Sequence, residues 1–329
     1  MVSRQSLLCV GSFAVNDVVH ANGDTEMNVP AGNALYSALG ALHILPNVSV
    51  AAVIGQDWKN NAISSLEALG TDCSLVLPHD NPSLRAWVVY ENSCDRRYLL
   101  RSPKIISLTP NPLAPPQSEE ETTTFASVAR ELHSNNCPRP QNMENLLSQF
   151  SGIHICPMPI NIVRQWIHAI RRTSDALISL DPPPFESEAP EFEALLDEVD
   201  IFIPSEAEAN TMYPNISPET FLLKMRDMGI PQCVLKLGAQ GCIGFTNHSS
   251  EILRVPAYTH GKTVDTTGAG DVFCGAFLGS YLKDKELREA MCKASAVASM
   301  YTESFDPFAA HQYTSTELEH RVATIRETL

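Results

Sequence analysis

Short runs of β-forming apolar residues alternate with helical patterns along most of this chain, and this order constrains the fold more than any other feature. The run LLCVGSFAV (7–15) is typical of a strand, and AGNALYSALGALHIL (31–45) has the apolar spacing of a helix. The alternation predicts further strands and helices at 48–55, 61–70, 152–156, 161–172, 176–181, 199–204, 233–238 and 252–258. Buried strands separated by helices are typical of a parallel sheet covered on both faces. We therefore expect an α/β fold with a mostly parallel central sheet, whose sites lie beyond the carboxyl ends of the strands.

Two regions interrupt the alternation. Residues 84–101 contain two alternating runs joined by the polar ENSCD, which predicts a β-hairpin with Trp87 and Val89 as its alternate apolar residues. Two strands alone are marginal in water, so we expect this hairpin to need a surface beneath it. Residues 103–145 are rich in proline and contain an acidic run. We expect much of this segment to form a mobile surface insertion, with a short helix near 124–133.

Composition and charge exclude several classes of function. Apolar residues make up 44% of the 329 residues, which suits a sizeable core in one large domain or two small ones. The formal net charge of −15 disfavours nucleic acid and anionic membrane surfaces as partners. No apolar stretch approaches the roughly 20 residues that span a bilayer. The nine cysteines form no CxxC pair and are expected to be buried free thiols, which predicts a reducing, cytoplasmic location.

The stretch DTTGAGD (265–271) places glycines directly before an apolar, helix-like run. The first N–H groups of a helix have no internal partner, and glycines let an anion approach them without a Cβ in the way. Asp271 would repel a phosphate bound there, unless it accepts a proton from a hydroxyl that attacks the phosphate. The alternative is structural, because a glycine turn followed by an acidic first-turn residue is also ordinary helix capping. The stretch is neither a Walker A loop nor GxGxxG.

The longer segment VDTTGAGDVFCGAFLGSYL (264–282) resembles the C-terminal signature of the PfkB (ribokinase-like) carbohydrate kinases. Other segments resemble the family in order along the chain: LLCVGSFAVND, VPAGNALYSALGAL, AAVIGQDW, IPSEAEA and VLKLGAQGCIGF. The resemblance implies a single kinase domain over 1–329 with a Rossmann-like ribokinase fold. It also implies a small β lid, which fits residues of about 14–32 together with 84–101.

The resemblance further implies roles for individual residues. Gly268, Ala269 and Gly270 would form the anion hole for ATP phosphate, and Asp271 would be the catalytic base. The remaining assignments are Lys236, Gly238, Gly241 and Ser295 to ATP; Asn16, Gly32, Asn33 and Arg101 to the acceptor; Glu208 to Mg²⁺ through water; and Asp265 and Thr267 to a monovalent cation such as K⁺. Purely structural alternatives stay open for several of these residues. Lys236 and Arg101 could be solvent-exposed charges, and Asp265 and Thr267 could stabilise a hydrogen-bonded turn.

This chain departs from the family pattern at three places. Asn16 stands where the family usually has an aspartate, Ala31 replaces the first glycine of Gly-Gly, and Ser205 replaces the asparagine of Asn-x-x-Glu. Asn16 can still hold a diol but is neutral, so we expect a changed substrate rather than a changed reaction. The leading prediction is an ATP-dependent kinase acting on a hydroxymethyl group of a small sugar-like acceptor, as a monomer or homodimer. The alternatives are a nucleoside kinase and a non-catalytic relative that acts through a partner.

Overall fold

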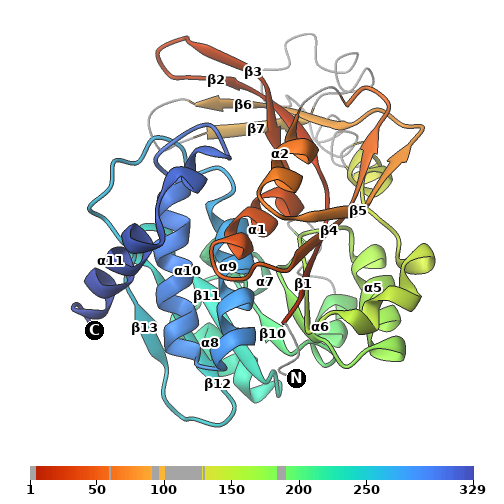
Figure 1. Ribbon diagram of the computed structural model, residues 1–329. Coiled ribbons are helices and arrows are strands. Elements are labelled where there is room, and N and C mark those ends of the chain that lie inside the picture. The colour runs from red at the N-terminus through yellow and green to blue at the C-terminus, as the bar shows by residue number, and fades with distance from the viewer. Residues whose placement is uncertain (1–4, 59–60, 91–95, 101–127, 129, 184–189) are drawn as a thin grey trace.

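The computed structural model describes the chain except for residues 1–4, 59–60, 91–95, 101–127, 129 and 184–189. Its centre is a nine-stranded sheet in the order β13-β12-β11-β10-β9-β8-β1-β4-β5 (Figure 1). Within this sheet the seven neighbouring strands from β11 to β5 pair in parallel, whereas β12 pairs antiparallel with both β11 and β13. Their bounds are β1 (Leu7–Val10), β4 (Val48–Gly55), β5 (Asp72–His79), β8 (Gly152–Ile155), β9 (Leu177–Leu180), β10 (Ile201–Phe202), β11 (Gln232–Lys236), β12 (Cys242–Thr246) and β13 (Leu253–Val255).

Helices cover both faces of this sheet, as the alternation in the sequence predicted. One face packs on helices at the two ends of the sequence, namely α1 (Asn33–Leu42), α2 (Ala62–Ala68), α9 (Ala269–Asp284), α10 (Leu287–Tyr301) and α11 (Ser315–Arg326). The other face packs on helices from the middle of the chain, namely α5 (Ile160–Thr173), α6 (Pro190–Leu196), α7 (Glu206–Met212) and α8 (Pro218–Asp227). All four residues of β1 and of β8 are buried, because both faces of these strands are covered.

A second, four-stranded sheet lies across the carboxyl ends of the central strands, and we call it the small sheet (Figure 1). It has the order β3-β2-β6-β7, with β2 (Ala14–Val19), β3 (Thr25–Ala31), β6 (Leu84–Tyr90) and β7 (Arg96–Leu100). The run 7–15 was expected to be one strand, and this prediction was wrong. Its residues divide at Gly11–Phe13 between β1 of the central sheet and β2 of the small sheet.

The predicted hairpin at 84–101 is present, because β6 and β7 pair antiparallel. It does not stand alone, since β6 also pairs in parallel with β2 and so belongs to the small sheet. The alternate residues that pack in a cluster are Val88 and Tyr90, with Phe305 and Val18, rather than the predicted pair Trp87 and Val89. The hairpin therefore has both a neighbouring strand and an apolar surface without any ligand.

The structure describes only part of the proline-rich segment. Of residues 103–145, those up to 127 and residue 129 lie outside the described structure, whereas 130–135 form a helix. The short turns η1 (Pro140–Asn142) and η2 (Glu144–Gln149) follow it. Trp166 of α5 donates from Nε1 to the carbonyl of Pro138 at 2.9 Å, and Met143 is buried. The later part of this segment is thus packed on α5, whereas most of the predicted insertion lies outside the described residues.

Two further observations concern the chain as a whole. No helix among the described residues combines the length and the apolar character needed to cross a bilayer. The eight cysteines within the described residues are all free and buried, while Cys94 lies outside them.

Candidate active site

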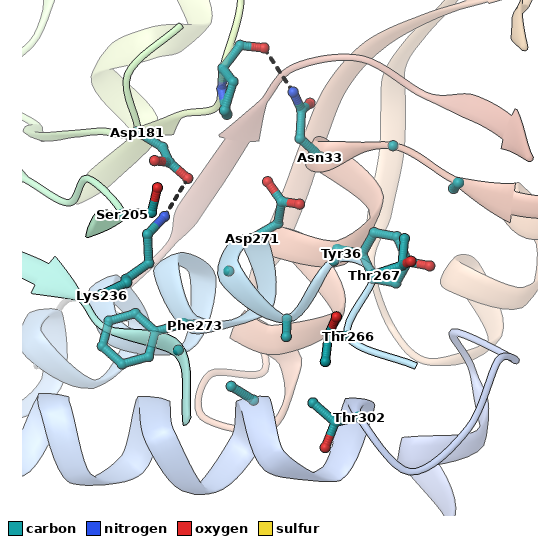
Figure 2. Close-up of a pocket in the computed structure, with 18 of the residues that line it drawn as sticks. Asn33, Tyr36, Asp181, Ser205, Lys236, Thr266, Thr267, Asp271, Phe273 and Thr302 are labelled. Atoms are coloured by element: carbon teal, nitrogen blue, oxygen red, sulfur yellow. Dashed lines mark hydrogen bonds and ion pairs between the residues drawn. The ribbon is translucent and has the colours of Figure 1, made fainter. Parts of the chain in front are cut away.

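A cavity of about 1030 Å³ lies between the carboxyl ends of the central strands and the small sheet. One part of its wall comes from β2, β3, β6, the start of α1, the helix 130–135 and the loop Pro157–Pro159, and we call it the small-sheet side. The opposite part comes from the turn between β11 and β12, the loop 257–263 and α10, and we call it the α10 side. The start of α9 lies between the two (Figure 2).

The start of α9 presents Gly268, Ala269 and Gly270 to the cavity. Gly268 has a φ of 74°, and a Cβ there would lie 2.3 Å from the ring of Tyr36. Only glycine fits this backbone and this close contact. A Cβ at Gly270 would meet only the Lys236 ammonium within 4 Å, at 3.7 Å. The first turn of α9 is therefore open to the cavity at Gly270, and its N–H groups are suited to bind an anion.

Asp271 lines the cavity from the same first turn and is half-buried. Helix α1 holds this turn in place, because the Ser37 hydroxyl donates to the Asp271 carbonyl at 3.1 Å. The two helices approach closely at Gly275, where a Cβ would lie 1.8 Å from the Ser37 carbonyl oxygen. Residues 272–280 of α9 are all buried. The helix lies between the sheet, α1 and α10, so its whole circumference is apolar.

Lys236 and Asp181 form a buried ion pair beside this turn (Figure 2). The Lys236 ammonium donates to Asp181 Oδ2 at 2.7 Å and also lies 3.4 Å from Cys274 Sγ. Burial opposes ionisation of the Asp181 carboxyl, whereas the adjacent Lys236 ammonium lowers its pKa and favours the carboxylate. Burial lowers the pKa of Lys236, but Asp181 and further acidic groups nearby, Glu208 among them, together hold it well above its ordinary value. A charged ammonium thus lies in the wall next to Gly270.

Ser205 and Glu208 begin helix α7 as a capping box. Glu208 Oε2 accepts from the Ser205 backbone N–H at 2.6 Å, and Ser205 Oγ accepts from the Glu208 N–H at 3.3 Å. Ser-x-x-Glu is a known sequence signal for a capping box, so this cap could have been predicted from the sequence. Both residues also line the cavity.

The oxygen atoms near Lys236 fit a magnesium ion that accompanies ATP. Asp181 Oδ1 is buried and has no hydrogen-bond partner among the described residues, and Glu208 lies close enough to raise the pKa of Asp181. Within the described residues no three metal-binding side chains gather at one point. Mg²⁺ usually keeps several waters and binds one or two carboxylates plus phosphate oxygens, and the two carboxylates present fit this requirement.

Asp265 and Thr267 shape the loop that leads into α9. Asp265 Oδ1 accepts from the Thr267 backbone N–H at 2.7 Å and from the hydroxyl of Tyr90. The Tyr90 hydroxyl also lies 3.3 Å from Thr267 Oγ1. Tyr90 belongs to β6, so this contact joins the small sheet to the loop before the anion site.

The small-sheet side holds three of the residues that the sequence assigned to an acceptor. Asn16 is 3% exposed, lines the cavity, and its Oδ1 has no partner among the described residues. Asn33 Oδ1 accepts from the Ser12 N–H at 2.8 Å, and its Nδ2 donates to the Pro157 carbonyl at 2.7 Å. Asn33 therefore fixes two loops of the wall. Gly32 precedes it with a φ of 116°, and a Cβ there would lie 2.3 Å from the Ser12 carbonyl oxygen. Arg101 lies outside the described residues.

The α10 side holds the residues that the sequence assigned to the nucleotide. Gly238 and Gly241 line the cavity from the turn between β11 and β12, and Ser295 lines it from α10. Ser295 is buried, and its hydroxyl lies 3.9 Å from Cys242 Sγ. The structure thus brings Lys236, Gly238, Gly241 and Ser295 to one cavity with the start of α9.

Sequence reasoning missed several residues of this cavity or its walls, among them Asp181, Tyr90 and Arg130. Asp181 is the last residue of the predicted strand 176–181 and directly follows β9, and a carboxylate at the end of a buried strand was an available signal. Tyr90 gave no local signal, because its partner is 175 residues away. Arg130 lines the small-sheet side from the region where the sequence predicted a short helix near 124–133, but it was not assigned to the site.

Known proteins resemble this chain in sequence and in fold. A sugar kinase of Archaeoglobus fulgidus, described as uncharacterized, is 33% identical over 130 residues, which are 39% of this chain and 50% of that protein. The chain thus aligns with about half the length of this curated relative. A ribokinase from Arabidopsis thaliana, solved with ribose and ATP, shares the fold with a TM-score of 0.70 at 18% identity, over 97% of this chain and 98% of that one.

A nucleoside kinase of Methanocaldococcus jannaschii, described as an archaeal member of the ribokinase family, has a TM-score of 0.69 at 15% identity. This match covers 98% of our chain and 99% of the other. Residues 4–309 match the model of the pfkB family carbohydrate kinases. Because that match spans nearly the whole chain, the protein belongs to the PfkB family of carbohydrate kinases and has the ribokinase fold.

Proposed function

We propose that this protein transfers the γ-phosphoryl group of ATP to a hydroxymethyl group of a small sugar-like acceptor. The observation that carries the proposal is the position of Asp271, in the wall of the cavity and one residue from the open first-turn glycine Gly270. A carboxylate beside an anion site has a chemical purpose when an acceptor hydroxyl must lose its proton.

In the proposed reaction each group of the chain has one task. Asp271 accepts the proton of the attacking hydroxyl, while the N–H groups at Gly268 to Gly270 and the Lys236 ammonium stabilise negative charge on the transferred group. When bound with ATP, Mg²⁺ supplies neutralisation of phosphate charge, and Asp181 and Glu208 are the residues that would hold it, Glu208 through water. The transition state is loose, so a weak base such as a carboxylate is adequate.

We assign the acceptor to the small-sheet side and ATP to the α10 side. Asn16 supports the first assignment, because a buried Oδ1 with no described partner needs a donor, and an acceptor hydroxyl supplies one. Asn33 acts as a positioning residue, since its amide ties Ser12 to Pro157. A nucleoside acceptor remains the alternative within the family.

The proposal is tested by measuring ATP turnover with a panel of acceptors: matched sugars, sugar acids, sugar phosphates and nucleosides. We expect ADP to form only when an acceptor is present and in a one-to-one ratio with phosphorylated acceptor. Asn16→Ala should raise KM for that acceptor more than it lowers kcat, since a lost substrate contact acts on binding. A protein that binds ATP but phosphorylates nothing in the panel would favour the non-catalytic alternative.

A further inference from the structure

The helix 130–135 brings a cation to the small-sheet side of the cavity. Arg130 and His133 lie three residues apart, so they share one face of this helix, and both line the cavity. The chain that follows the helix is fixed to the central sheet, because Asn136 Oδ1 lies 3.2 Å from His79 Nε2 at the end of β5. Arg130 is exposed, as expected for a residue at the rim of an open cavity.

Carboxylates line other parts of the cavity but not this side of it. The four that line the cavity are Asp181, Glu208, Asp271 and Glu303. Asp181 pairs with Lys236, Glu208 caps α7, and Glu303 pairs with Arg321 at 2.7 Å. Asp271 belongs to the start of α9. Among the described residues, Arg130 is therefore the only charged group that lines the small-sheet side.

Arg130 makes no ion pair or hydrogen bond within the described structure, and the neighbouring Glu131 does not line the cavity. Other arginines of the molecule do have acidic partners, for example Arg321 with Glu303 and Glu317. In a protein with a net charge of −15, an arginine that faces a cavity without an acid marks a local site for an anion. The guanidinium fork matches a carboxylate or a phosphate through two parallel hydrogen bonds.

His133 adds a neutral polar group beside Arg130. Burial lowers the pKa of His133 to about 4, so its imidazole is uncharged at neutral pH. A neutral imidazole can both donate to and accept from a hydroxyl. The small-sheet side thus offers one cation and three groups that suit hydroxyls or loop positioning, namely His133, Asn16 and Asn33.

We infer that the acceptor is a polyhydroxy compound with one anionic end group, a carboxylate or a phosphate, which Arg130 binds while the hydroxyl to be phosphorylated lies beside Asp271. This inference rests on the proposed kinase function. It adds Arg130 as an acceptor-binding cation to the sequence-based assignment of Arg101, which lies outside the described residues.

Steady-state kinetics with matched acceptors test the inference. The acceptors are a neutral sugar, the corresponding sugar acid and the corresponding sugar monophosphate, each at saturating ATP and Mg²⁺. We expect the unmodified protein to prefer one anionic acceptor, and comparison of the two anionic arms tells a carboxylate from a phosphate. In Arg130→Gln, kcat/KM for the preferred acceptor should fall about 10- to 100-fold, mainly through KM, as for loss of a hydrogen bond to a charged group.

Three controls separate this effect from a general loss of structure. Arg130→Lys keeps the charge but not the fork, so it should recover part of the lost kcat/KM. Arg164→Gln changes an arginine of α5 that does not line the cavity, and it should leave kcat/KM unchanged for every acceptor. In Arg130→Gln, KM for ATP and turnover of the neutral sugar should stay within about 3-fold of the unmodified protein, a change below 1 kcal/mol.

Three outcomes would overturn the inference without contradicting the proposed function. One is equal loss for neutral and anionic acceptors in Arg130→Gln, and another is a rise only in KM for ATP. The third is an unmodified protein that phosphorylates neutral acceptors and rejects both anionic ones, which would leave the proposed kinase function standing. A protein that phosphorylates none of the acceptors tested would contradict the proposed function itself and this inference with it.

Discussion

The ammonium of Lys236 lies 2.7 Å from the carboxylate of Asp181, and a Cβ at Gly270 would lie 3.7 Å from the same ammonium. The side chains of Lys236 and Asp181 are only 12% and 4% exposed. Asp181 therefore compensates a buried cation and holds it against the first turn of α9. A buried ion pair of this kind costs desolvation and seldom adds stability, so its presence fits a role in binding phosphate better than a role in folding.

Separate and combined removal of the two charges distinguishes these roles. Asp181→Leu leaves an uncompensated buried ammonium and should destabilise the fold by about 3–5 kcal/mol. The double variant Asp181→Leu, Lys236→Met leaves an apolar pair and should recover most of that loss in urea unfolding. Its KM for ATP should nevertheless stay raised at least about 10-fold, or 1.4 kcal/mol.

Lys293→Met is the matched control, because Lys293 pairs with Asp284 and Glu289 at the surface, away from the cavity. It should change the free energy of unfolding by less than about 1 kcal/mol and leave KM for ATP unchanged. If the double variant binds ATP as tightly as the unmodified protein, Lys236 does not contact the phosphates.

Asp271→Asn keeps the size of the side chain and removes the proton acceptor. We expect kcat to fall about 10²- to 10⁴-fold, as for loss of a general base. ATP affinity measured by titration calorimetry should be retained, since the backbone N–H groups of the first turn are unchanged. Asp284→Asn, at the other end of α9, is the control and should keep full turnover. An Asp271→Asn variant with normal kcat would show that this carboxylate is only a helix cap.

The two glycines at the start of α9 should respond differently to substitution. Gly270→Val places its side chain in open cavity space, so the protein should fold normally while KM for ATP rises at least about 10-fold. Gly268→Ala forces a Cβ into the ring of Tyr36 at a φ of 74°. Backbone strain alone should then cost about 1–3 kcal/mol in urea unfolding. Unchanged ATP binding in a folded Gly270→Val variant would contradict the anion site.

Tyr90→Phe removes the hydroxyl that joins the small sheet to the loop at Asp265 and Thr267. The loss of one such hydrogen bond is worth about 1 kcal/mol. We therefore expect amide hydrogens at 265–268 to exchange about 5-fold faster, as measured by mass spectrometry. Tyr281 of α9 does not line the cavity, so Tyr281→Phe serves as the control. Equal exchange rates in Tyr90→Phe and the unmodified protein would mean that the small sheet does not hold this loop.

Buried histidines should make the fold sensitive to acid. His154 is fully buried against Ser179, and burial lowers its pKa from 6.5 to about 3. As pH falls below 6.5 the unfolded chain takes up a proton that the folded chain does not, so stability falls until about pH 3. At pH 5 this histidine alone should cost about 2 kcal/mol relative to neutral pH.

Urea unfolding at pH 7.5 and pH 5 measures this effect. Between the two pH values the free energy of unfolding should fall by about 2 kcal/mol less in His154→Leu than in the unmodified protein, whatever the absolute stability of the variant. His168→Leu is the control, because His168 is an exposed residue that pairs only with Glu198. If His154→Leu and the unmodified protein lose the same stability between pH 7.5 and pH 5, burial does not lower the pKa of His154.

Features that depend on neighbouring residues could be predicted from short stretches of the chain. Alternating apolar runs predicted the parallel sheet and its helices, because burial of both sheet faces imposes that order on the chain. The glycines before Asp271 predicted an open helix start, since first-turn N–H groups lack partners in any helix. The resemblance around 264–282 then named the family, and the family model confirmed it.

Tertiary structure decided what depends on residues far apart in the chain. Asp181 and Lys236 are 55 residues apart, and Tyr90 and Asp265 are 175 apart. Only the order of the strands and the position of the small sheet bring these pairs together. The same order divides the run 7–15 between two sheets and turns Arg130 toward the cavity. Local patterns report the hydrogen bonds and burial of one segment, whereas contacts between segments depend on the packing of the whole chain, which no single stretch of sequence encodes.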